Sequence, residues 1–225
     1  RYPGPRKQGC IWLHAVSVGE TRAAQPIVER LLERHPGHTI VMTHMTPTGR
    51  AAGEQLYGER VLRCYLPYDF ASTAGRFLDH FRPSLGLVME TEVWFNTILA
   101  CRARAIPLYL ANARLSEKSW RGYQRVRELA GRALNELTGI AAQSEADAGR
   151  FRALGAQNAT VIGNIKFDIE PDAALIARGR QWREQWGSPR RVFLAASTRD
   201  GEEALLLDVL DRFDVPGLLA VIVPR

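Results

Sequence analysis

Few cysteines and no long hydrophobic run characterise this sequence. The chain of 225 residues has three cysteines, Cys10, Cys64 and Cys101, which are far apart and surrounded by apolar residues. An odd, scattered set of this kind argues against a disulfide framework and a zinc site, and it favours a reducing compartment. No apolar run approaches the roughly 18–20 residues of a membrane-spanning helix, and no signal peptide is recognisable.

Acidic residues are outnumbered by basic ones, 24 against 30, which gives a formal net charge of +6. The hydrophobic fraction of 46% and the charged fraction of 24% exclude a disordered or collagen-like chain. The chain starts with Arg1 rather than Met, and it ends at Arg225 in a segment that looks like a strand running into a loop. We therefore expect a fragment of a longer protein.

Short apolar runs alternate with amphipathic segments over residues 1–163. Such runs predict buried strands, and apolar residues at helical spacing between them predict helices. The alternation predicts an α/β fold with a parallel sheet that is covered by helices on both faces. The expected strands span 11–16, 39–43, 61–66, 85–89, 106–111, 139–143 and 159–162, and the expected helices include 20–34, 71–80 and 93–105. A further helix is expected to have Thr46 as its N-cap and Pro47 at its first position.

The pattern weakens after Gly163, and residues 164–172 are interpreted as a linker. A second α/β unit is then predicted from a helix over 173–186, a strand over 192–195, a helix over 202–213 and a strand over 218–223. We interpret residues 173–225 as the truncated start of a second domain.

Polar residues gather in the loops that follow the predicted strands, where parallel sheets bind their ligands. The loop Ser17-Val-Gly-Glu20 has two interpretations. In the first interpretation the loop forms a capping box, in which Ser17 caps the helix and Glu20 reaches back to the Ser17 amide. Alternatively, Glu20 is a general base, and Gly19 lets a ligand approach the backbone closely. His14, inside a predicted strand, is interpreted as a core histidine.

Charged and hydroxyl side chains of four further segments leave two interpretations each. Glu90 and Glu92 either favour the dipole of the next helix or belong to a site. Arg114 is either solvated or pairs with a carboxylate or phosphate, and Lys166 is either a linker charge or lies in a crevice between domains. Ser197 and Thr198 either cap a helix or hold a phosphate.

Basic residues recur in the segment 114–132, close to Trp120 and Tyr123. We expect Arg114, Lys118, Arg121, Arg125 and Arg132 to lie near one helical face. A solvated face is the default interpretation of such a stripe, and an anionic lipid surface is the next. Nucleic acid ranks last, because no nucleic-acid-binding motif accompanies the charge.

Taken together, these segments resemble the 3-deoxy-D-manno-octulosonic acid (Kdo) transferases. The resemblance covers essentially the whole chain, and the motifs occur in the family's order: Ile11-Trp-Leu-His14-Ala-Val-Ser-Val-Gly-Glu20, Thr43-His-Met-Thr-Pro-Thr-Gly49, Tyr65-Leu-Pro-Tyr-Asp69, Met89-Glu-Thr-Glu-Val-Trp94, Ala111-Asn-Ala-Arg-Leu-Ser116, Ala142-Gln-Ser-Glu145, Gly163-Asn-Ile-Lys-Phe-Asp168 and Val223-Pro-Arg225. Each motif is weak by itself, and the ordered set is specific.

The resemblance implies an inverting glycosyltransferase with the two-domain GT-B fold, whose first domain takes a lipid A precursor and whose second takes CMP-Kdo. It implies Kdo transfer to the 6′-hydroxyl of the lipid at the cytoplasmic face of the bacterial inner membrane. The family normally carries an amino-terminal hydrophobic anchor and a longer carboxyl-terminal half, which this sequence does not contain. We therefore expect the lack of a membrane helix to reflect where the chain was cut.

Residue by residue, the resemblance makes Glu20 the general base and makes Glu92, with Glu90, the second essential carboxylate. It makes Arg225 a contact of the CMP moiety. Substrate contacts are further expected from Ser17, Gly19, Thr46, Thr48, Gly49, Arg114, Lys166, Ser197 and Thr198. No Asp-x-Asp pair occurs, and we expect no metal or other cofactor. The alternatives are another GT-B enzyme of nucleotide sugars, with a UDP donor or as an epimerase, and a non-catalytic binding module.

Overall fold

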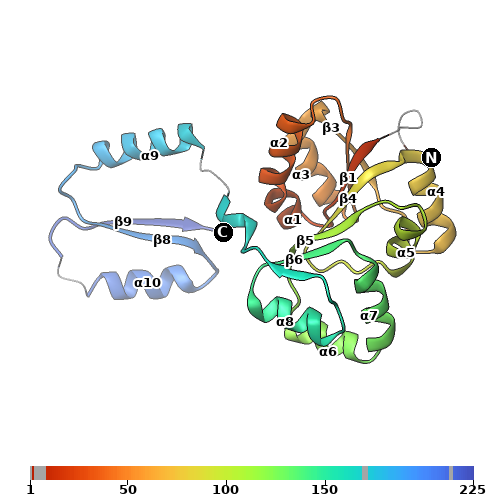
Figure 1. Cartoon of the computed structure of the whole chain (residues 1–225). Coiled ribbons are helices and arrows are strands. Elements are labelled where there is room, and N and C mark those ends of the chain that lie inside the picture. The colour runs from red at the N-terminus through yellow and green to blue at the C-terminus, as the bar shows by residue number, and fades with distance from the viewer. Residues whose placement is uncertain (1, 3–8, 169–171, 213–214) are drawn as a thin grey trace. The chain divides into compact units, whose positions relative to one another are not determined.

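The computed structural model describes all residues except 1, 3–8, 169–171 and 213–214. The chain forms two compact units, residues 1–169 and residues 170–225 (Figure 1). Helices and strands alternate along the chain in both units, so each unit has an α/β structure.

The first unit is built on a seven-stranded sheet in the order β3-β2-β1-β4-β5-β6-β7. Every neighbouring pair is parallel, which confirms the predicted parallel α/β fold. The strands are β1 (Cys10–His14), β2 (Ile40–His44), β3 (Val61–Tyr65), β4 (Pro83–Met89), β5 (Leu108–Ala113), β6 (Gly139–Ala142) and β7 (Ala159–Val161).

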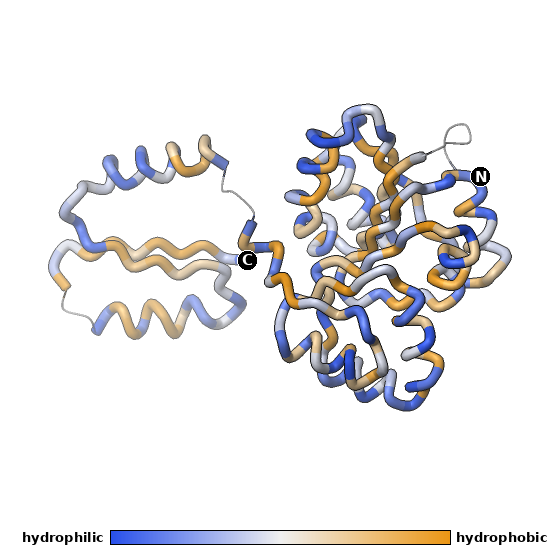
Figure 2. Tube along the Cα trace, in the orientation of Figure 1, coloured by the Kyte–Doolittle hydropathy of each residue, from blue (hydrophilic) through white to orange (hydrophobic). Residues whose placement is uncertain are grey.

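Helices of the first unit cover both faces of this sheet (Figure 1). They are α1 (Val18–Ala23), α2 (Gln25–Arg34), α3 (Pro47–Tyr57), α4 (Ala71–Phe81), α5 (Phe95–Ala103), α6 (Glu117–Gln124), α7 (Arg127–Glu136) and α8 (Glu145–Ala153), with the short 3₁₀ turns η1 (Gly58–Arg60) and η2 (Ile165–Asp168). The strands form the apolar centre between these helices (Figure 2).

The core is divided between the two faces of the sheet, because successive side chains of a strand point to opposite sides. Trp12 of β1 packs with Phe77 and Phe81 on one face, and its ring centroid lies 5.2 Å from that of Phe77. Leu13, the next residue, packs with Met42 on the other face. All five residues of β1 are buried, so the strand fixes its register from both sides.

Two predicted helices are interrupted. The helix expected over 20–34 ends at Ala23, and α2 begins at Gln25, because Pro26 has no amide hydrogen with which to continue the helix. The basic segment also divides between α6 and α7, with Arg125 and Val126 between them. Arg114 precedes α6. The expectation that the five basic residues share one face of a single helix is therefore wrong.

The second unit contains α9 (Ala173–Gln185), β8 (Val192–Thr198), α10 (Glu202–Leu210) and β9 (Leu219–Pro224). Its two strands are parallel, and Val192 pairs with Leu219. Neither α9 nor α10 buries a residue. In the part of this unit that the structure describes, the apolar side chains of Leu205 and Leu207 in α10 are exposed, and so is that of Leu194 in β8.

Candidate functional site

The order of the strands in the first unit indicates where a ligand is expected to bind. The chain passes outward from β1 to β2 and β3, and then returns to β4 on the other side of β1. Ligands of open α/β sheets bind at such a reversal, outside the carboxyl ends of the strands. The first turn of α1, directly after β1, carries Glu20, and the loop after β4 carries Glu90 and Glu92.

The carboxylate of Glu20 is held close to the end of β1. One oxygen, Oε2, accepts a hydrogen bond from the backbone N–H of Val16 at 2.8 Å, and Oε1 accepts from the Ser17 hydroxyl at 3.0 Å. The Ser17 hydroxyl in turn accepts from the Glu20 amide at 3.3 Å. Ser17 is therefore the predicted N-cap, but the expected return bond is corrected: Glu20 binds the amide of Val16 and not that of Ser17.

Burial is the main cause of a raised pKa at Glu20, whose residue is only 9% exposed. The Val16 amide and the Ser17 hydroxyl oppose this increase, and the negative charges of Glu90 and Glu92 add to it. The pKa of Glu92 is also raised, by burial and by the charge of Glu90. We call Glu20, Glu90 and Glu92 the acidic cluster. A carboxylate with a raised pKa is a stronger base at neutral pH.

Lys166 brings a cation to the acidic cluster. Its Nζ lies 3.8 Å from Oε1 of Glu90, and its side chain is 51% exposed, so the pair contributes little to stability. Glu90 has a left-handed backbone, with φ of 59°, and its amide donates to the Ala111 carbonyl at 2.9 Å. We call residues 90–94, between β4 and α5, the acidic loop. The bond anchors the start of this loop to the neighbouring strand β5.

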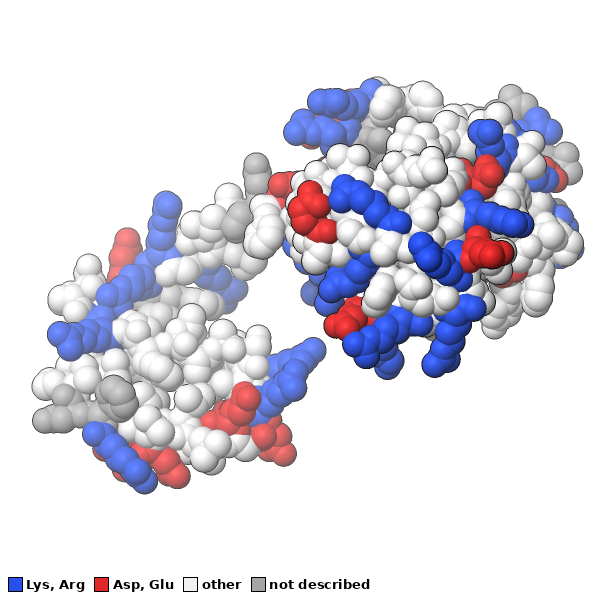
Figure 3. Space-filling view, turned by 60° about the horizontal axis from the view of Figure 1, so that its bottom comes forward, with Lys and Arg blue, Asp and Glu red and all other residues white. Residues whose placement is uncertain are grey.

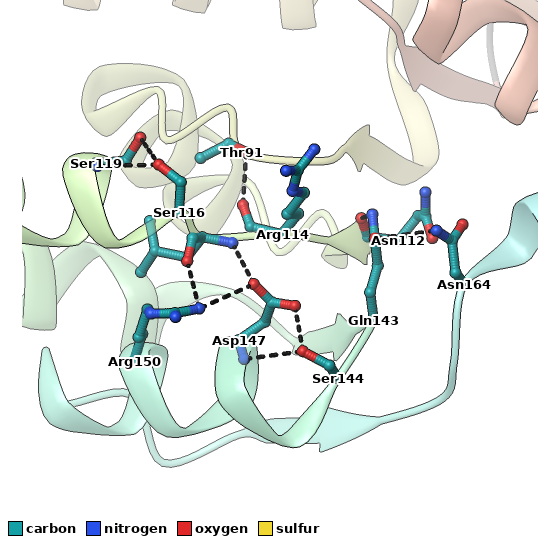
Figure 4. Close-up of polar contacts among 11 residues, drawn as sticks. Thr91, Asn112, Arg114, Ser116, Ser119, Gln143, Ser144, Asp147, Arg150 and Asn164 are labelled. Atoms are coloured by element: carbon teal, nitrogen blue, oxygen red, sulfur yellow. Dashed lines mark hydrogen bonds and ion pairs between the residues drawn. The ribbon is translucent and has the colours of Figure 1, made fainter. Parts of the chain in front are cut away.

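The segment that carries Lys166 is docked on the first unit. The side-chain oxygen of Asn112 accepts from the Ile165 amide at 3.1 Å, and Asn164 donates to Oε1 of Gln143 at 3.2 Å. Gln143 in turn donates to the Asn112 carbonyl at 2.9 Å (Figure 4). Residues 164–168 are thus part of the first unit, which corrects the predicted linker; its residues 169–171 lie outside the described part of the chain.

Arg114 lies in the loop between β5 and α6, and it is exposed. Its carbonyl accepts from the Thr91 hydroxyl at 2.5 Å, which ties this loop to the acidic loop (Figure 4). The guanidinium has no hydrogen bond or ion pair with another residue that the structure describes. It is therefore available to an anionic ligand, and a guanidinium binds carboxylate or phosphate in two parallel hydrogen bonds.

Thr46 and Gly49 hold α3 against the Ser17 loop. The Thr46 hydroxyl donates to the Val16 carbonyl at 3.0 Å and accepts from the Gly49 amide at 3.1 Å, which confirms the predicted N-cap. Thr48 is exposed, and its hydroxyl lies 3.5 Å from that of Thr46. Gly19 is exposed too, and a Cβ there would meet no atom closer than 3.8 Å.

The substitution Gly49→Ala is expected to destabilise the first unit by about 1–3 kcal/mol, the usual cost of overpacking. A Cβ at Gly49 would lie 2.7 Å from the Val16 carbonyl oxygen and 2.9 Å from the Thr46 hydroxyl. Urea denaturation measures the change. The control is Gly149→Ala in α8, where a Cβ meets nothing within 4 Å and alanine favours the helix. Equal midpoints for Gly49→Ala and the unsubstituted chain would contradict this packing.

Asp69 is a residue that sequence analysis did not assign to the site. It follows β3, and its carboxylate accepts from the Asn96 amide at 2.9 Å and from the Thr97 amide at 2.8 Å. Trp94, the residue before α5, supplies no side-chain cap, so Asp69 caps this helix from another loop. Because α5 follows Glu92 closely, this cap fixes where the acidic loop ends. No local spacing signals it.

His14 and His44 are buried at the ends of β1 and β2. Nδ1 of His14 lies 2.8 Å from the Thr43 hydroxyl, and Nδ1 of His44 lies 2.9 Å from the Ala15 carbonyl. Burial is the main cause that lowers the pKa of His14 to about 3 and that of His44 to about 4. Both imidazoles are neutral at pH 7, and His14 is the predicted core histidine.

In the second unit, Ser197, Thr198 and Arg225 meet at the carboxyl ends of β8 and β9. The Arg225 amide donates to the Thr198 carbonyl at 3.0 Å, and Ser197 has a left-handed backbone with φ of 61°. The N-cap of α10 is Gly201, no side chain caps this helix, and Oε2 of Glu202 accepts from the Arg199 amide at 2.8 Å before the helix begins. The alternative in which Ser197 or Thr198 caps this helix is therefore wrong.

Two features are absent from the described residues. No group of three or more His, Cys, Asp or Glu side chains is arranged there to hold a metal ion. No helix there is both long enough and apolar enough to cross a membrane.

Lys and Arg gather on the face of the first unit that carries α6 and α7 (Figure 3). A shallow hollow on this face is lined by Lys118, Arg121 and Arg125, together with Glu117 and Gly122. The exposed apolar residues Val126 and Leu129 line a neighbouring hollow with Arg132. We call Lys118, Arg121, Arg125 and Arg132 the basic surface.

Comparison with solved structures shows the fold. The chain is similar to the UDP-GlcNAc 2-epimerase from Neisseria meningitidis bound to UDP-GlcNAc, with a TM-score of 0.60 and 16% identity over 94% of this chain and 64% of that one. It is also similar to MurG of Acinetobacter baumannii, with a TM-score of 0.55 and 12% identity over 96% of this chain and 68% of that one. The predicted GT-B fold is thereby confirmed.

Comparison of sequences shows the family. A 3-deoxy-D-manno-octulosonic acid transferase of Bordetella pertussis is 40% identical over 96% of this chain and 52% of its own length. The transferase of the same name from Haemophilus influenzae is 36% identical over 98% of this chain and 52% of its own length, so the chain spans about half of these curated relatives. The family described as 3-Deoxy-D-manno-octulosonic-acid transferase (kdotransferase) matches residues 1–169. The chain belongs to the Kdo transferase family.

Proposed function

We propose that the full-length protein transfers Kdo from CMP-Kdo to the 6′-hydroxyl of a lipid A precursor, with inversion at the anomeric carbon. The observation that carries this proposal is the acidic cluster at the reversal of the strand order, in a chain of the Kdo transferase family. The first unit takes the lipid acceptor, and the second unit takes the donor.

Glu20 is the general base in this proposal. It accepts the proton of the acceptor hydroxyl as the hydroxyl oxygen attacks the anomeric carbon, and the bond to the phosphate oxygen breaks as CMP leaves with the electron pair. CMP is a good leaving group, so one displacement with one base suffices and gives inversion. The charges of Glu90 and Glu92 support the step by raising the pKa of Glu20.

Arg114 and Lys166 bind the anionic groups of the substrates, which are a carboxylate on Kdo and phosphates on donor and acceptor. Ser17, Gly19, Thr46, Thr48 and Gly49 line the acceptor side. In the second unit, Ser197, Thr198 and Arg225 hold the CMP moiety. Fixed cations and helix N-termini neutralise the phosphate in this scheme, and we propose no metal or other cofactor for it.

The alternative is an enzyme with a UDP donor on the same fold, which the likeness to UDP-GlcNAc 2-epimerases brings forward. Calorimetry on the full-length protein separates the two, with CMP, CMP-Kdo, UDP and UDP-GlcNAc as ligands and a radiolabelled transfer assay beside it. We expect binding of the cytidine ligands alone, and transfer of Kdo to a lipid A precursor. Binding of UDP-GlcNAc without Kdo transfer would overturn the proposal.

We also propose that the protein works at the cytoplasmic face of the inner membrane, and that the basic surface contacts anionic lipid there. Each basic residue near an anionic surface contributes about 1 kcal/mol to binding. Reversal of Arg121, Arg125 and Arg132 to Glu is expected to weaken binding to vesicles of phosphatidylethanolamine and phosphatidylglycerol by at least about tenfold. Co-sedimentation at physiological salt measures the change.

The matched control reverses Arg22, Arg30 and Arg34, three exposed residues of α1 and α2 that make the same change in net charge. It is expected to weaken binding much less, because these residues lie outside the basic surface. Equal losses for the two triple variants would mean that net charge alone attracts the protein to the vesicle. That result would refute a membrane role for this surface.

A further inference from the structure

We propose that Asp147 and Arg150 of α8 are positioning residues that hold Arg114 in place to bind an anionic substrate group. This inference rests on the proposed function and deepens it. Neither residue belongs to the acidic cluster, and both act through the backbone of Leu115, which follows Arg114 in the chain.

Asp147 and Arg150 clamp both polar groups of Leu115. Oδ1 of Asp147 accepts from the Leu115 amide at 2.9 Å, and Nη1 of Arg150 donates to the Leu115 carbonyl at 3.1 Å. The two side chains are themselves an ion pair, with 3.5 Å between Nη1 and Oδ1 (Figure 4). Since Leu115 is fully buried, its side chain anchors the same residue in the core.

The rest of the loop is held in the same way. Gln143 donates to the Asn112 carbonyl at 2.9 Å, and Thr91 donates to the Arg114 carbonyl at 2.5 Å. The backbone on both sides of Arg114 is therefore bound to α8, to the loop after β6 and to the acidic loop, while its guanidinium is left exposed. These hydrogen bonds fix the position of the Arg114 backbone relative to Glu90 and Glu92.

Helix capping alone does not account for Asp147. Its second oxygen, Oδ2, accepts from the Ser144 hydroxyl, and its amide donates to that hydroxyl at 3.2 Å, which is an ordinary cap of α8. The cap makes no use of Oδ1 or of Arg150. Asp147 is only 8% exposed, and hydrogen bonds to charged groups in such surroundings are stronger and more directional than neutral ones. The clamp on Leu115 is thus a separate contact.

A double-mutant cycle in the full-length protein tests the inference through kcat/KM for Kdo transfer. Asp147→Ala alone removes the acceptor of the Leu115 amide and the partner of Arg150, and it is expected to lower kcat/KM by about tenfold to a hundredfold, because small misplacements of a binding group have effects of this size. In an Arg114→Ala background the same substitution is expected to change kcat/KM by less than about twofold, since there is no guanidinium left to position. The matched control is Asp79→Ala, which removes the carboxylate that pairs with Arg104 at 2.9 Å on the surface, and it is expected to leave kcat/KM unchanged.

An equal loss from Asp147→Ala in both backgrounds would overturn the inference, because it would show a structural role that does not pass through Arg114. Hydrogen–deuterium exchange gives a second readout that needs no activity. Asp147→Ala is expected to speed exchange in the peptide that contains residues 114–116, because the Leu115 amide loses its acceptor, and Asp79→Ala is not. Unchanged exchange in Asp147→Ala would also overturn the clamp. Absence of Kdo transfer by the unsubstituted protein would instead count against the proposed function alone.

Discussion

The substitution Glu20→Gln is expected to lower the rate of Kdo transfer by about 10²–10⁴-fold, the usual contribution of a general base. Glutamine keeps the shape of the side chain, and its oxygen still accepts the hydrogen bond from Val16. It has no basic carboxylate for the proton of the acceptor hydroxyl. Single-turnover transfer with saturating CMP-Kdo measures the chemical step, and Glu20→Ala is expected to behave alike.

The stability of Glu20→Gln separates a catalytic role from a structural one. Burial and the charges of Glu90 and Glu92 disfavour ionised Glu20 in the folded protein, so the neutral side chain is expected to be equally or more stable at pH 7. The control is Glu33→Gln on α2, where the carboxylate is 65% exposed, and it is expected to change neither rate nor stability. Transfer at the unsubstituted rate by a correctly folded Glu20→Gln variant would refute the assignment of the base.

The second large effect is a loss of stability in mild acid that originates from His14. The pKa of His14 is about 3 in the folded chain, and that of an unfolded histidine is about 6.5. Below pH 6.5 the unfolded chain therefore binds the proton that the folded chain excludes, and stability falls as pH falls. Between pH 7 and pH 5 the expected loss is about 2 kcal/mol from His14, and His44 acts in the same direction.

Urea denaturation at several pH values measures this effect in the chain and in His14→Gln. The variant is expected to be less stable at pH 7 and to lose less stability between pH 7 and pH 5. Glu20 and Glu92 act in the opposite direction, because their raised pKa values favour the folded state as they take up protons, so the difference between the two proteins isolates His14. His35→Gln, at an exposed histidine, controls for loss of an imidazole. Parallel pH profiles for the unsubstituted chain and His14→Gln would contradict the account.

Features that depend on neighbouring residues in the chain were predictable from the sequence. The strands and the N-caps Ser17 and Thr46 follow from periodicity and from spacings of three residues. The break between α1 and α2 belongs to this class, because Pro26 carries the signal for it. The prediction of one helix over 20–34 rests on the apolar residues at helical spacing, which continue across Pro26.

Contacts between distant segments were not predictable in this way. Asp69 binds the amide of Asn96, 27 residues further on, and Asp147 binds that of Leu115, 32 residues before it. The docking of Ile165 on Asn112 joins residues 53 apart, and the sequence alone shows this segment only as a weak pattern. These contacts arise when the sheet brings the carboxyl ends of its strands together, which no local spacing encodes.

The meeting of the three carboxylates illustrates the same point. Glu20 and Glu92 each have a plausible local role as acidic residues near a helix start. Only the strand order, with β1 beside β4, brings them close enough for the charge of Glu92 to raise the pKa of Glu20. The family motifs contain the same residues, and the topology supplies the physical reason why they lie close together.

The pH dependence of kcat/KM for Kdo transfer by the full-length protein tests the central claim most directly, because it reports the free enzyme's essential base. A general base at Glu20 predicts an acidic limb above the ordinary pKa of a glutamate carboxyl. It also predicts that Glu90→Gln moves this limb to lower pH, since the charge of Glu90 raises the pKa of Glu20. A limb at the same pH in the unsubstituted protein and in Glu90→Gln would contradict it.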